Sequence, residues 1–164
     1  MLIDIRPIMP GDVTAIAGLA RTTWLDAYAN ILSLEQIDYM LAERYHPERL
    51  RADTRDPKKW LRQACLDNTL AGFAACEIHE GEFKLDKLYV HPDMQRKGIG
   101  AALVGHAAAL ARDRGFPVMI LAVNKQNARA IHAYTQYGFR VRNATVTPIG
   151  NGFVMDDYIM EKTL

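Results

Sequence analysis

Alternating apolar and polar residues mark several short stretches of this chain as strands, each bounded by turn residues. Six such stretches are residues 2–6, 60–66, 69–79, 83–90, 139–146 and 153–162. The second and third are joined by Asp67-Asn68, and the last two by the turn-rich segment 148–152. The pattern therefore predicts an N-terminal strand, a three-stranded meander and a C-terminal hairpin.

Apolar residues at helical spacing predict four helices between these strands. They begin near Val13, near Leu34, at the apolar run 101–111 and at Asn127. Ser33, with Gln36 three residues later, has the pattern of a capping box for the second helix. The stretch 118–123 is wholly apolar, which is typical of a strand covered on both faces, and 45–59 is expected to be loop or short helix.

Composition narrows the class of protein. With 164 residues, 49% of them hydrophobic and 24% charged, the chain is expected to form one soluble domain over residues 1–164. A net charge of +1 gives no reason to expect a nucleic acid or membrane partner. There is no export signal pattern, so the two cysteines are expected to be reduced and the protein cytoplasmic. The five histidines form no metal-binding pattern.

The most informative stretch is Gln95-Arg96-Lys97-Gly98-Ile99-Gly100-Ala101. It joins the predicted strand 83–90 to the predicted helix 101–111. The first N–H groups of a helix lack internal partners, and glycine lets the main chain approach a ligand closely. Arg96 and Lys97 add two positive charges at the same place. The stretch therefore predicts a phosphate-binding turn.

Two common phosphate-binding motifs do not fit this turn. A dinucleotide fingerprint needs a small third residue where the chain has Leu103, and an acidic residue near 121–124 that is missing. A P-loop needs Lys-Ser/Thr after the glycine. The remaining pattern, Gln-x-x-Gly-x-Gly-Ala, resembles the pyrophosphate-binding signature of the GCN5-related N-acetyltransferase (GNAT) superfamily.

Other segments extend the resemblance. The segment 88–92 resembles the family's fourth strand, 124–139 its second signature, and 5–7 and 157–164 its ends. The resemblance implies an α/β (α+β) fold with a mixed, mostly antiparallel sheet of about seven strands flanked by helices. It also implies an enzyme that uses acetyl-CoA as cosubstrate and no metal. The acetyl group would pass to a primary amine of a small molecule or peptide by direct attack in a ternary complex.

The resemblance also implies residue roles. The main chain of Leu88, Tyr89 and Val90 would lie along the pantetheine, with an N–H near Val90 facing the thioester carbonyl. Asn127 would bind the pantetheine arm, although it could equally be a helix N-cap. Tyr134 corresponds to the general acid that protonates the leaving thiolate.

The residue that deprotonates the amine is not fixed by the sequence. Glu82 stands where some family members carry a glutamate base, whereas the position used by others is Lys84. Asp86, Glu77 or a chain of waters linked to them are alternatives.

Two alternative functions remain open at this point. Because Lys84 replaces the glutamate base of other members, the protein could be a sensor that binds acyl-CoA without catalysis. The glycine turn alone would also suit a nucleotide-binding module. The acceptor is expected near Trp24, Tyr28 and Tyr39, and segment 88–92 is reminiscent of members that acetylate polyamines or other small amines. The apolar strand 153–162 is expected to be an open edge at which two copies could form a homodimer.

Overall fold

A mixed seven-stranded sheet organises the structure, a computed structural model that describes residues 2–164. The strands are β1 (Ile3–Pro7), β2 (Lys59–Leu66), β3 (Thr69–His79), β4 (Glu82–Val90), β5 (Val118–Asn124), β6 (Arg140–Gly150) and β7 (Phe153–Thr163). Their order is β1-β2-β3-β4-β5-β7-β6, and every neighbouring pair is antiparallel except β4 and β5. The predicted fold class is confirmed.

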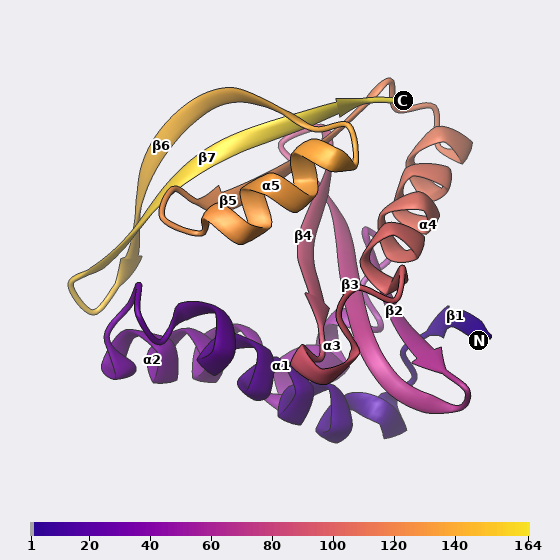
Figure 1. Ribbon diagram of the computed structural model, residues 1–164, viewed down its shortest axis with the longest axis horizontal. Helices are drawn as coiled ribbons and strands as arrows, with labels where there is room; N and C mark the ends of the chain where they lie inside the picture. Colours follow the sequence, from indigo (N-terminus) through magenta and orange to yellow (C-terminus); the bar gives the residue numbers. More distant parts are fainter. Residues whose placement is uncertain (1) are drawn as a thin grey trace.

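Five α-helices in the described residues cover the two faces of the sheet (Figure 1). They are α1 (Val13–Tyr28), α2 (Leu34–Arg44), α3 (Pro47–Asp53), α4 (Ile99–Asp113) and α5 (Ala128–Gln136). Helices α1 to α3 pack on one face, and α4 and α5 on the other, each over its own apolar cluster. Half of the capping box predicted for α2 is present, because Gln36 N donates to Ser33 Oγ at 3.1 Å, whereas the Gln36 side chain donates to Val154 O. None of these helices is long and apolar enough to cross a membrane.

Strands β4 and β5 separate soon after they meet. They pair only at Phe83 with Met119 and at Lys84 with Ile120. Beyond Lys84 the main chain of β4 therefore has no strand partner on its β5 side. This separation opens the middle of the sheet at the end where β4 leads into the glycine turn.

The C-terminal hairpin differs from the prediction in its turn. Asn151 and Gly152 both have positive φ, at 52° and 78°, which is the backbone of a tight two-residue hairpin turn. Strand β6 therefore runs to Gly150 instead of ending at 146. Pro148 is tolerated because β6 is an edge strand. The expectation that 153–162 forms the open edge was wrong, since β7 lies between β5 and β6.

A β-bulge in β4 places two charged side chains on one face. Lys87 pairs with Ala75 and Leu85 with Cys76, so Asp86 is an extra residue in β4. The Nζ of Lys87 accordingly reaches Oδ2 of the adjacent Asp86 at 2.9 Å. Strict alternation would have pointed these neighbours to opposite faces of the sheet.

Candidate active site

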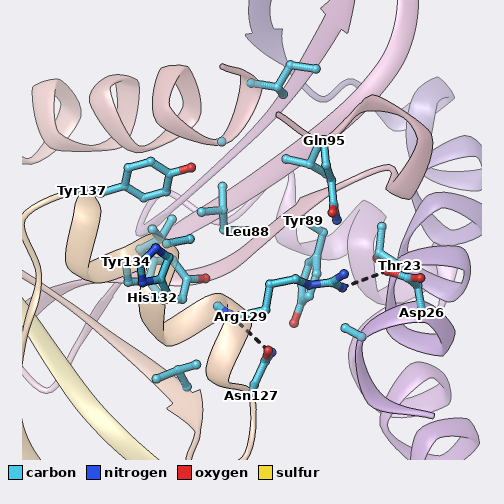
Figure 2. Close-up of a pocket in the computed structure, with 18 of the residues that line it drawn as sticks. Thr23, Asp26, Leu88, Tyr89, Gln95, Asn127, Arg129, His132, Tyr134 and Tyr137 are labelled. Atoms are coloured by element: carbon cyan, nitrogen blue, oxygen red, sulfur yellow. Dashed lines mark hydrogen bonds and ion pairs between the residues drawn. The ribbon is translucent and has the colours of Figure 1, made fainter. Parts of the chain in front are cut away.

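The main pocket occupies the opening between β4 and β5. It has a volume of about 430 Å³ and is lined by residues of α1, β4, the glycine turn, β5 and α5 (Figure 2). Predicted site residues in its lining are Leu88, Tyr89, Val90, Gln95, Arg96, Gly98, Ile99, Gly100, Asn127 and Tyr134. The structure thus brings together two sequence segments that are about thirty residues apart.

One end of the pocket is the N-terminus of α4. The first hydrogen bond of this helix runs from Ala102 N to Gly98 O at 3.0 Å. The N–H groups of Ile99, Gly100 and Ala101 consequently have no acceptor in the helix, and they lie at the positive end of its dipole. This is the arrangement that binds phosphate groups. The side chains of Lys97 and Ala101 are exposed and outside the lining.

The two glycines of the turn have different roles. Gly98 has a φ of +82°, which disfavours other residues, and nothing lies within 4 Å of where its Cβ would be. The open space beside it is therefore available to a ligand. A Cβ on Gly100 would lie 2.8 Å from the Tyr137 hydroxyl. Gly100 thus lets α5 approach the turn and close this end of the pocket.

Strand β4 forms the floor of the pocket. The side chains of Leu88 and Val90 pack against the cluster under α4 and α5, and Tyr89 packs against the opposite cluster. Their main chain, without a strand partner on the β5 side, is left to contact a ligand. That these three residues act through the backbone stays a prediction.

Asn127 caps α5 and also lines the pocket. Its Oδ1 accepts a hydrogen bond from Ala130 N at 3.2 Å, so it is the N-cap of α5. It also lines the pocket, near Tyr28. The capping bond uses the amide oxygen, and the amide nitrogen is on the side of the Tyr28 hydroxyl.

Tyr134 lines the pocket from α5. Burial raises the pKa of its hydroxyl well above the usual range, and the nearby hydroxyls of Tyr28 and Tyr45 add to this shift. The group is therefore protonated at neutral pH and can donate a proton. Tyr137 instead lies against Gly100, at the phosphate end.

An ion pair that the sequence did not indicate joins α1 to α5 at this pocket. Nη2 of Arg129 lies 2.9 Å from Oδ2 of Asp26, and both residues belong to the lining (Figure 2). The pair links residues 103 positions apart, so no local pattern could have revealed it. It connects the helix that carries Tyr134 to the helix that carries Tyr28.

The structure corrects the expected position of Glu82. Glu82 is the first residue of β4, at the opposite end of the strand from Val90, and it is not in the pocket lining. Its carboxylate pairs with Nη1 of Arg142, a residue of β6, at 2.8 Å.

Asp86 is the carboxylate of β4 that does line the pocket. Its neighbours are Lys87 Nζ at 2.9 Å, Arg44 Nη2 at 2.7 Å and Lys84 Nζ at 3.7 Å. Burial alone would raise the pKa of Asp86, but these three positive charges hold it well below its usual range. A carboxylate so strongly stabilised in its charged form is a poor base.

The other alternative, Glu77, lies on β3 outside the pocket lining, with Lys59 Nζ 3.9 Å away. Among residues 2–164, no group of three or more His, Cys, Asp or Glu side chains is placed to hold a metal ion.

A splayed strand pair, a helix N-terminus for phosphate and a buried tyrosine together define an enzyme class, the acyl-CoA-dependent transferases. The family model of the acetyltransferase (GNAT) family matches residues 24–139. The chain belongs to this family, and it is a CoA-dependent N-acetyltransferase.

Individual relatives agree with this assignment. The chain is 30% identical to a spermidine N(1)-acetyltransferase of Thermoplasma acidophilum, over 95% of this chain and 97% of the relative. It is 32% identical to the ribosomal protein bS18-alanine N-acetyltransferase of Escherichia coli, over 66% and 79%. Among solved structures, the PaiA N-acetyltransferase of Thermoplasma acidophilum in complex with coenzyme A matches with a TM-score of 0.87, 29% identity and full coverage of both chains.

Proposed function

We propose that this enzyme transfers the acetyl group of acetyl-CoA to a primary amine of a small molecule or peptide, by direct attack in a ternary complex. One observation carries the proposal: a single pocket joins the open N–H groups of α4, the unpaired main chain of β4 and the Tyr134 hydroxyl. The pyrophosphate would bind the α4 N-terminus, and the pantetheine would replace the missing strand partner of β4.

In this mechanism the amine attacks the thioester carbonyl, and a main-chain N–H near Val90 stabilises the oxyanion. Tyr134 then protonates the departing thiolate. The amine must lose its proton before it attacks, because an alkylammonium has a pKa of about 10. Glu82 is too far along β4 for this step and Asp86 is too acidic, so the proton leaves through another carboxylate or through water.

Two measurements test the proposal. Calorimetric titration should show micromolar binding of acetyl-CoA and much weaker binding of NAD and ATP, since the turn lacks their motifs. A thiol-release assay over a panel of primary amines should then show turnover. Binding of NAD or ATP in preference to acetyl-CoA would overturn the cofactor assignment, and binding without any turnover would favour the sensor.

A further inference from the structure

One part of the main pocket lies over the middle of β5. Ala122 lies in the middle of β5, between β4 and β7, yet its side chain is exposed and lines the pocket. Its neighbours Leu121 and Val123 pack under α4 and α5, so Ala122 faces the side of α1 and α2. We call the part of the pocket over Ala122, which Tyr28 and Asp86 also line, the acceptor recess.

Asp157 of β7 lies on the same face of the sheet as this recess, one strand away, and has an oxygen without a hydrogen-bond partner among residues 2–164. Met155, two residues earlier on the same strand, packs with α2, so Asp157 faces the same side as Ala122. Its strand partner is Asn124, two residues from Ala122. Asp157 is only 9% exposed, and its Oδ1 is buried without a hydrogen-bond partner among residues 2–164. A buried carboxylate normally has a hydrogen-bond partner, so the Asp157 carboxylate is a candidate acceptor for a donor on the ligand.

The opposite side of the recess has unused donors. Arg44 contacts both oxygens of Asp86 through Nη2 alone, which leaves Nε and Nη1 without a hydrogen bond in the described part of the chain. Lys84 Nζ lies 3.7 Å from Asp86, beyond hydrogen-bond distance. Burial raises the pKa of Asp157. The positive charges of Lys84 and Arg44 lower this pKa, but they offset only part of the rise.

The charges around the recess do not balance. Arg44, Lys84 and Lys87 are positive, whereas Asp86 and Asp157 are negative, so three positive charges face two negative charges. A polyamine would add further positive charge to this surface. A molecule with an amino group and a carboxylate would instead satisfy both the unused oxygen and the unused donors.

We infer that the acceptor of the proposed acetyl transfer is an aminocarboxylate, such as an amino acid, with its amino group at Asp157 and its carboxylate at Arg44 and Lys84. The inference rests on the proposed function and narrows its substrate class. It differs from the substrate in the name of the Thermoplasma relative, which is spermidine.

The test compares acceptors that differ only in the acidic group. Thiol release with acetyl-CoA is measured for several α-amino acids, for the corresponding amino acid amides and for spermidine. We expect kcat/KM to be at least about tenfold higher for an acid than for its amide, because the carboxylate makes charge-assisted hydrogen bonds that the amide lacks.

Two pairs of variants locate the effect. Lys84→Met should lower the ratio of kcat/KM for the acid to kcat/KM for the amide about tenfold, whereas Lys58→Met, an exposed lysine outside the recess, should leave this ratio unchanged. Asp157→Asn should raise KM for every amine about tenfold. Its neighbour Asp156 pairs with Lys125 on the opposite face, so Asp156→Asn is a matched control without effect. Unchanged acetyl-CoA affinity shows that each variant is folded.

The outcomes separate this inference from the proposed function. Equal rates for acids and amides, or a preference for spermidine, would overturn the aminocarboxylate assignment and leave acetyl transfer standing. Bound acetyl-CoA without turnover of any acceptor would overturn both. Failure to bind acetyl-CoA would overturn the proposed function at its first step.

Discussion

At the residue scale, Tyr134 is the proposed proton donor to the leaving thiolate. Its hydroxyl lines the pocket, and burial raises its pKa, so the hydroxyl is protonated at neutral pH. A thiol has a pKa of about 8.5, so the thiolate is a weaker base than the phenolate, and the transfer depends on how the hydroxyl is positioned. The proposed role therefore needs the hydroxyl and not the ring.

We expect Tyr134→Phe to lower kcat about a hundredfold, the usual contribution of a general acid, and to change acetyl-CoA affinity less than threefold. Tyr137→Phe is the matched control, because Tyr137 lies on the same helix against Gly100, and kcat should be unchanged. Single-turnover kinetics and calorimetry measure the two quantities. A Tyr134→Phe enzyme with normal kcat would exclude Tyr134 from the mechanism.

For Asp86 we expect an effect on the free energy of unfolding. Asp86→Asn would leave Lys87, which is only 7% exposed, without its carboxylate partner. We expect a loss of about 3 kcal/mol in the free energy of unfolding in urea at pH 7, as for other broken buried ion pairs. Asp38→Asn is the control, because its partner Arg21 is exposed, and it should change stability by less than about 0.5 kcal/mol.

The charge of Asp86 should also make the stability of the folded protein depend on pH. The pKa of Asp86 is lower in the folded protein than in the unfolded chain, so its stabilising effect is present above the unfolded pKa of about 3.9. It is lost as the pH falls through the folded pKa. Below pH 4 the native protein should therefore lose stability more steeply than Asp86→Asn. Parallel curves for the two proteins would contradict the assigned pKa shift.

At the scale of elements, the turn between β4 and α4 combines an unusual backbone with empty space. Gly98→Trp should abolish measurable acetyl-CoA binding, because the indole would fill the space beside the open N–H groups. The positive φ should cost about 1 kcal/mol of stability, which a folded protein tolerates. Gly105→Trp, later in α4 and also with open space at its Cβ position, should bind acetyl-CoA normally. Equal affinities in calorimetry would show that the turn does not hold the cofactor.

The elements also show what the sequence could and could not predict. Strands and the glycine turn were predictable because alternation, turn residues and a helix start are local patterns. The length of β6 was underestimated because Pro148 was taken for the turn, although Asn151-Gly152 carries the stronger turn signal. Asp86 was one of several equal candidates, because a bulge and the distant Arg44 determine its surroundings.

At the scale of the whole molecule, the two sides of the recess come from the two ends of the chain. Helices α1 and α2 supply Tyr28 and Arg44, and β7 supplies Asp157. The tip of the β6–β7 hairpin reaches across to α2 (Figure 1), where Tyr39 donates to Ile149 O at 2.8 Å and Gln36 Nε2 to Val154 O at 2.9 Å. These two hydrogen bonds hold the hairpin, and with it β7, against α2.

This docking leads to a prediction for a residue outside the lining. Tyr39→Phe removes one hydrogen bond, worth about 1 kcal/mol, between α2 and the hairpin. Amide hydrogen exchange near Ile149 should become about fivefold faster, while exchange in β5 stays unchanged. KM for the acceptor should rise and acetyl-CoA affinity should not, because the α4 N-terminus is independent of the hairpin. Faster exchange without a change in KM would mean that the docked hairpin does not shape the acceptor site.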